Sequence, residues 1–241
     1  MHWALFAQVD NALTEKLSLV VGGRYTDEER TLEEMMTRGG DSIAAPESTS
    51  FSNFSGDITL NYKPGENVLT YVKLSRGFKS GGFAANATSL AARGPATAEN
   101  LTAWEAGFKS DLFDDRLRIN GAVFLYDFEG LQANAGTSDQ EGNIVVDFLN
   151  AGDATVTGAE LEITAVPTDY LYLSLGVGLL DSEIESDLIF DGSVVDGNSL
   201  PGAPELNANA LIRYTFPRTS VGDFDLQIDG VDRGAITWGE T

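Results

Sequence analysis

Short and long connectors alternate along this chain, and segments with the alternating hydrophobicity of β-strands lie between them. The short connectors are polar turns at residues 11–15, 63–66, 111–115, 167–169 and 217–222. The long connectors are polar stretches at residues 27–50, 78–98, 130–143 and 181–204. Hairpins with every short turn at one end and every long loop at the other are typical of outer-membrane barrels. The pattern therefore predicts an all-β fold, an antiparallel up-and-down transmembrane β-barrel.

Alternation of apolar and polar residues defines about ten strands between these connectors. The clearest segment is 170–180, where Leu or Val occupies every second position from Leu171 to Leu179. Most segments have about 9–11 residues, which suits a tilted membrane strand. An even strand count requires residues 144–165 to form one long strand, with a β-bulge at Gly152 and Asp153. The expected strands are 3–9, 16–26, 51–62, 68–77, 101–110, 116–126, 144–165, 170–180, 206–216 and 223–232.

Charged residues alternate with apolar ones inside several of these strands. Burying carboxylates such as Glu160 and Glu162 in the core of a soluble sandwich would be costly, whereas a water-filled lumen accepts them. We therefore expect six charged residues to face the lumen: Glu105, Lys109, Arg118, Glu160, Glu162 and Arg213. Aromatic residues near strand ends predict interfacial girdles, and these are Tyr25, Phe51, Tyr62, Tyr170, Tyr172, Tyr214 and Phe216.

Composition excludes several classes of function. The chain carries 15 Lys and Arg against 37 Asp and Glu, a formal charge of −22, which argues against a nucleic-acid partner. Cysteine is absent and the only histidine is His2, so a thiolate or histidine metal site and a catalytic triad have almost nothing to build on. We expect no enzyme activity, no catalytic residues, no metal site and no cofactor.

Three stretches resemble one protein family. They read YVKLSRGFKSGGF at 71–83, ENLTAWEAGFKSDLFDDRLRINGAVFLYDFEGLQ at 99–132, and FLNAGDATVTGAELEI at 148–163, followed by the PTDY turn at 167–170. Together they resemble the barrel of a TonB-dependent outer-membrane receptor of the ferric-siderophore type. The resemblance covers nearly the whole chain, and it is specific for the family but not for the substrate.

The resemblance implies a large barrel, of 22 strands in such transporters, whose lumen is closed by a plug. About ten strands are visible, so we expect residues 1–241 to form a partial barrel domain that lacks the plug. In the family, outer loops hold the ligand. Five residues at the end of the 68–77 strand and in the following loop are therefore expected to contact an anionic ferric chelate: Arg76, Phe78, Lys79, Phe83 and Arg93.

The resemblance also implies a function and its partners. We expect energy-coupled uptake of a ferric siderophore, or of a similarly large nutrient, across the outer membrane of a Gram-negative bacterium. The partners would be membrane lipid, the nutrient, and a TonB-type energy-transducing protein acting through the plug. Two alternatives remain open at this point. One is a passive outer-membrane channel or barrel enzyme, and the other is a soluble β-sandwich binding module whose leucine face at 171–179 packs against a second sheet.

Overall fold

The computed structural model describes residues 2–33, 35–38, 41–44, 47–83, 94–138, 144–187, 189–190, 193–194 and 196–235. Ten strands form one antiparallel sheet in which the neighbours follow each other along the chain. In sheet order they are β1 (His2–Ala12), β2 (Leu17–Leu32), β5 (Glu47–Gly65), β6 (Val68–Lys79), β7 (Glu99–Leu112), β8 (Leu117–Glu129), β11 (Asp153–Thr168), β12 (Leu171–Glu185), β15 (Leu206–Thr215) and β16 (Asp225–Arg233).

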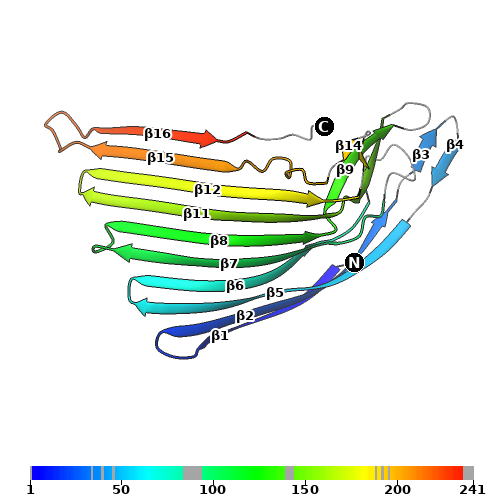
Figure 1. Ribbon diagram of the computed structural model, residues 1–241, viewed down its shortest axis with the longest axis horizontal. Coiled ribbons are helices and arrows are strands. Elements are labelled where there is room, and N and C mark those ends of the chain that lie inside the picture. Colours follow the sequence, from blue (N-terminus) through cyan, green and yellow to red (C-terminus); the bar gives the residue numbers. More distant parts are fainter. Residues whose placement is uncertain are drawn as a thin grey trace.

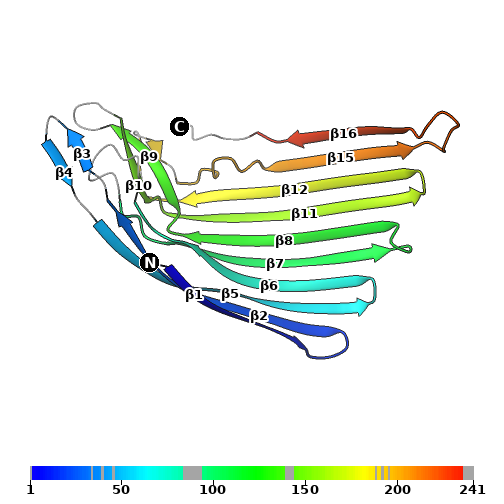
Figure 2. The same cartoon turned by 180° about the vertical axis from the view of Figure 1, so that it is seen from behind.

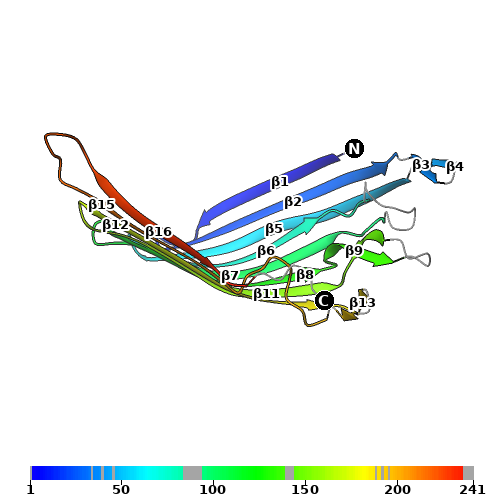
Figure 3. The same ribbon diagram turned by 90° about the horizontal axis from the view of Figure 1, so that it is seen from above.

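Short turns and long connectors lie at opposite ends of this sheet, as the sequence predicts (Figure 1). The same arrangement is visible from behind (Figure 2). Three of the long connectors carry a small hairpin of their own, and these are β3 (Met35–Arg38) with β4 (Asp41–Ala44), β9 (Gln132–Ser138) with β10 (Ile144–Asn150), and β13 (Ile189–Phe190) with β14 (Ser193–Val194). The sheet is bent into an open trough whose two edges are β1 and β16 (Figure 3). The predicted antiparallel membrane-barrel architecture of about ten strands is confirmed, as a barrel that is not closed.

The strand register gathers apolar side chains on one face of the sheet. Because paired residues point to the same side, one row crosses seven strands through Leu19, Leu60, Val72, Ala106, Val123, Ala159 and Leu179. These side chains are not covered by a second layer, since Val72, Val123 and Leu179 are 55%, 57% and 53% exposed. We call this side the apolar face and the opposite side the polar face.

Burial on the two faces is the reverse of that in a soluble sheet. In β5 the polar residues Asn53, Asp57 and Asn61 are half-buried, while Phe54 and Ile58 on the apolar face are exposed. A soluble sandwich would bury the apolar side against another sheet. No second sheet covers the leucines of β12 in the part of the chain that the structure describes, so the β-sandwich alternative is wrong.

The chain between β8 and β11 differs from the prediction. Residues 144–150 form a separate strand, β10, which pairs with β9, so the single kinked strand predicted over 144–165 is wrong. Gly152 has a φ of 116° and separates β10 from β11, where the sequence predicts only a bulge. That backbone conformation favours glycine because it has no Cβ. The strand count stays even, since β9 and β10 add a complete hairpin inside the connector.

Several strands extend further than the sequence predicts. β2 continues to Leu32, β5 begins at Glu47 and β12 continues to Glu185. Residues 27–32, 47–50 and 181–185 are therefore strand and not loop, as are Phe78 and Lys79 at the end of β6. β5 has 19 residues, far more than the roughly 9–11 that cross a membrane. The strands thus carry the acidic residues of these segments beyond the apolar band.

Aromatic residues mark both ends of the apolar face, in part as predicted. Tyr25 contacts Trp3 at a ring distance of 5.4 Å near the loop end, and Tyr214 contacts Phe216 at 4.9 Å near the short turns. Tyr62 also belongs to the apolar face. Two predicted girdle members lie elsewhere, because the register puts Phe51 opposite Glu28 and Tyr172 opposite Arg213 on the polar face. No helix that could span a membrane occurs among the described residues.

The ring of Phe124 in β8 lies over Gly158, the residue paired with it on the neighbouring strand β11. Both residues belong to the polar face. A Cβ atom at Gly158 would collide with this ring and lie 2.7 Å from the carbonyl oxygen of Leu179. Phe124 also stacks on Tyr126 at a ring distance of 4.7 Å, which restricts its movement. Gly158 therefore allows an aromatic side chain to pack flat on the polar face.

We expect Gly158→Ala to destabilise the protein by about 1–3 kcal/mol, because overpacking forces the ring and the backbone to shift. Gly178→Ala is the matched control, since its Cβ would be 3.9 Å from the nearest atom, the carbonyl oxygen of Asn207. The control should change stability by no more than about 0.5 kcal/mol. Urea unfolding of the detergent-folded protein measures both values, and equal costs would contradict the packing argument.

The two faces also predict opposite responses to arginine at adjacent positions of β11. Leu161→Arg places a charge on the apolar face and should cost about 2–4 kcal/mol if that face contacts hydrocarbon. Glu162→Arg places the same charge on the polar face and should cost only about 0.5 kcal/mol. Unfolding from lipid vesicles would measure the difference, and a larger cost for Glu162→Arg would overturn the assignment of the faces.

Candidate functional site

The polar face carries all six charged residues that the sequence predicts to face a lumen. Glu105 and Lys109 lie on β7, Arg118 on β8, Glu160 and Glu162 on β11, and Arg213 on β15. The register connects them through shared partners, and Asn120 of β8, for example, pairs with both Lys109 and Glu162. The structure thus brings the six residues onto one surface. Their role as a lumen wall stays a prediction.

Polar side chains on this face are joined across the strands. The Tyr71 hydroxyl donates a hydrogen bond of 2.5 Å to the Glu105 carboxylate. The Arg118 guanidinium donates a hydrogen bond of 2.6 Å to Asp111, the residue opposite it on β7. Such cross-strand pairs on one face stabilise a sheet, and a hydroxyl that bonds a carboxylate is held in one orientation.

A second cross-strand cluster lies near the short turns. Arg213 donates hydrogen bonds of 2.9 and 2.7 Å to the Gln227 side chain on β16, and its guanidinium lies 5.8 Å from the centre of the Tyr172 ring on β12. Sequence analysis missed Tyr71 and Gln227, and it assigned Tyr172 to an interfacial girdle. Their positions opposite polar-face residues on neighbouring strands are the signal that could have identified them, but that signal requires the register.

A hollow of about 330 Å³ opens on the polar face between β8 and β15. Its lining includes two carboxylates, two amides and an aromatic ring, from Glu160, Glu162, Asn207, Asn209 and Phe124. The floor contains Gly176 and Gly178 of β12, whose missing side chains leave the space. Among the described residues, no ion pair includes Glu105, Glu160 or Glu162. The hollow can therefore accept hydrogen-bond donors or a cationic group from a partner.

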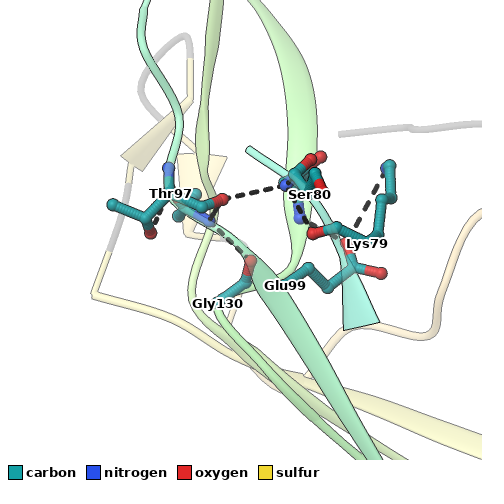
Figure 4. A network of polar contacts seen from close by, with 7 residues as sticks. Lys79, Ser80, Thr97, Glu99 and Gly130 are labelled. Atoms are coloured by element: carbon teal, nitrogen blue, oxygen red, sulfur yellow. Dashed lines mark hydrogen bonds and ion pairs between the residues drawn. The ribbon is translucent and has the colours of Figure 1, made fainter. Parts of the chain in front are cut away.

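A network of hydrogen bonds lies at the loop end of the sheet, where the connector between β6 and β7 meets the base of hairpin β9–β10 (Figure 4). The side-chain nitrogen of Gln132 donates to the carbonyl oxygens of Ser80 and Thr97, at 3.0 and 2.8 Å. Its backbone N–H donates to the carboxylate of Glu99 at 2.7 Å. Glu99 also pairs with the Lys79 ammonium at 3.8 Å.

The structure does not bring the predicted ligand contacts onto one face of the sheet, because Lys79 lies on the polar face of β6 and Arg76 and Phe78 lie at alternate positions on its apolar face. Lys79 belongs to the hydrogen-bond network and its side chain is 59% exposed. Phe78 precedes Lys79 in β6, and Phe83 follows Gly82, which forms a bridge with Ala96. Arg76 continues the alternate positions of Val72 and Leu74, so it lies at the loop-end margin of the apolar face. Arg93 lies outside the described residues.

The described residues contain no group of three or more His, Asp or Glu side chains that is arranged to hold a metal ion. Asp181, Glu183 and Glu185 near the end of β12 occupy alternate positions of an extended strand, so they form a row of exposed carboxylates along one face. The charged and polar groups of the described residues are therefore distributed over the surface of the sheet.

Comparison with known proteins identifies the family. The TonB dependent receptor-like β-barrel family matches residues 1–241. Among curated proteins, the chain is 25% identical to the probable TonB-dependent siderophore receptor PiuA of Acinetobacter baumannii, over 87% of this chain and 29% of that protein.

Solved structures share the fold. The ferric yersiniabactin uptake receptor FyuA of Yersinia pestis has a TM-score of 0.77 at 16% identity, over 95% of this chain and 37% of that one. The crystal structure of PiuA from Acinetobacter baumannii has a TM-score of 0.70 at 21% identity, over 88% and 31% of the two chains. This chain spans about a third of the length of these relatives. It belongs to the TonB-dependent receptor β-barrel family of the Gram-negative outer membrane.

Proposed function

We propose that this chain forms part of the wall of a receptor that takes up a ferric siderophore, or a similarly large nutrient, by an energy-coupled mechanism. The family match over residues 1–241 carries this proposal. The similarity to a protein described as a probable siderophore receptor supports the class of substrate. The receptor would bind its ligand and move it across the membrane without changing it chemically.

The arrangement of the sheet supports its role as part of a wall. Lipid would cover the apolar face, and β1 and β16 would pair with further strands, because unpaired backbone groups are not tolerated in hydrocarbon. The long connectors would then extend outward from the membrane, and the short turns would lie on the periplasmic side. The whole wall would surround a lumen bounded by the polar face.

The polar face would contact the plug that fills the lumen of such receptors. The carboxylates of Glu105, Glu160 and Glu162 form no ion pair with the described residues. They would accept hydrogen bonds from donors of the plug, while Lys109, Arg118 and Arg213 would keep the wall hydrated. Through the plug, a TonB-type energy-transducing protein would drive rearrangement and passage of the ligand.

The loop end of the sheet would bind the ligand. Lys79 is exposed and cationic, and Phe78 and Phe83 flank it along the chain. An ammonium group and aromatic rings suit an anionic ferric chelate, because charge-assisted contacts are strong and the rings supply apolar area. Arg76 would add positive charge at the same end of the sheet, from the other face of β6.

We expect Lys79→Glu to weaken binding of the ferric siderophore by about tenfold, since it replaces an attractive charge by a repulsive one. Lys63→Glu is the matched control, because Lys63 lies on β5 at the opposite end of the sheet. Binding would be measured with radioactive iron on cells that express the receptor as their only siderophore receptor. Equal affinities of the two variants would contradict the assignment of the ligand site.

The same cells distinguish energy-coupled uptake from a passive channel. Collapse of the proton gradient with an uncoupler should stop accumulation of the ferric chelate but leave surface binding intact. A passive channel would continue to equilibrate the chelate after the uncoupler is added. That result would remove the energy-coupled mechanism and favour the channel.

A further inference from the structure

One glutamine and one asparagine side chain close the base of hairpin β9–β10. Gln132 and Asn150 are the last paired positions of this hairpin, opposite each other at the end nearest the main sheet. Both side chains form hydrogen bonds within the network at the loop end. Their side chains form hydrogen bonds with residues outside the hairpin.

Asn150 uses both ends of its amide. Its oxygen accepts hydrogen bonds from the backbone N–H and the hydroxyl of Thr97, at 2.8 and 2.9 Å. Its nitrogen donates to the carbonyl oxygens of Gly130 and Thr97, at 2.6 and 3.2 Å. Thr97 lies 53 residues away in the connector between β6 and β7. One side chain thus reproduces the bonds that a neighbouring strand would supply.

Gln132 reaches the same connector from the other strand of the hairpin. Its side-chain nitrogen lies among the carbonyl oxygens of Lys79, Ser80 and Thr97. Its side-chain oxygen is buried and accepts no hydrogen bond from the described residues. Leaving a buried oxygen without a donor is costly, so the orientation is held by the three carbonyl groups and by the backbone bond to Glu99.

The connector has its own closure at this point. Gly82 and Ala96 exchange two backbone hydrogen bonds of 3.1 and 3.0 Å, which bring the two ends of the connector together. Gly81 is adjacent, and a Cβ there would collide with the carbonyl oxygen of Ala96 and contact the Phe51 ring. The bases of the two loops are therefore packed closely enough for amide side chains to link them.

We propose that Gln132 and Asn150 lock the base of hairpin β9–β10 to the base of the β6–β7 connector, so that the bases of these two loops form one rigid unit. The link is made by two side chains and not by a continuous sheet, because the backbone leaves the main sheet at Gly130 and Gly152. Both glycines have positive φ, 68° and 116°. Lys79 joins the unit through Glu99, whose side chain is only 13% exposed. The lock does not depend on the nature of the ligand.

Hydrogen exchange of the membrane protein in detergent, without ligand, tests the lock. Asn150→Leu removes the side-chain hydrogen bonds that Asn150 forms with Thr97 and Gly130. The proposal predicts that exchange also becomes about fivefold faster at the amides of Gly82 and Ala96, which Asn150 does not contact through any hydrogen bond. Asn134→Leu is the matched control, because Asn134 is an exposed asparagine on the same hairpin.

The control should leave exchange at Gly82 and Ala96 unchanged. Amides in the centre of β7 and β8 should stay protected in every variant, which shows that the sheet is intact. If Asn150→Leu fails to fold, Gln132→Met tests the same prediction from the other strand, since it removes the donors to Ser80 and Thr97 but keeps the length of the side chain. Faster exchange at Thr97 alone, with Gly82 and Ala96 unchanged, would overturn the proposal.

Discussion

The exposed apolar face of the ten-stranded sheet is the constraint on which the rest of the structure depends. In water, a row such as Leu60, Val72 and Val123 would require a second layer to cover it, and the described residues supply none. Hydrocarbon removes this need, but it requires every backbone N–H and C=O group to be paired within the protein. The long antiparallel ladder meets that requirement everywhere except at the edges of β1 and β16. The membrane thus determines which residues face outward, and it leaves the edges of β1 and β16 as the part of the ladder that is not paired within the described sheet.

The polar face follows from the same constraint. Because lipid occupies one side of each strand, every second residue is free to be polar, and residues such as Tyr71 and Glu105 can pair across strands. Glycines on this side, among them Gly158 and Gly176, leave room for rings and for the hollow beside Glu160. The face therefore combines cross-strand pairs with carboxylates, Glu160 and Glu162, that form no ion pair with the described residues.

At the loop end the constraint changes, because the chain is again in water. The strands run past the apolar band, as in β5 with its 19 residues, and the connectors can form hairpins of their own. Here side chains replace the sheet ladder as the link between neighbouring segments. The amides of Gln132 and Asn150 are the clearest example, since they bond backbone groups of a connector that the main sheet does not reach.

The sequence by itself determined the alternating strands, the two classes of connector and the separation of charged from apolar residues, because a period of two is a local property of the chain. It also carried the family resemblance, on motifs that the family comparison confirms. Only the tertiary structure decided that residues 144–150 leave the main sheet and pair with residues 132–138. The physical reason is that a short apolar run suits a sheet strand and a loop hairpin equally well. Pairing partners and positive φ values at Gly130 and Gly152 distinguish the two, and these depend on contacts between distant residues.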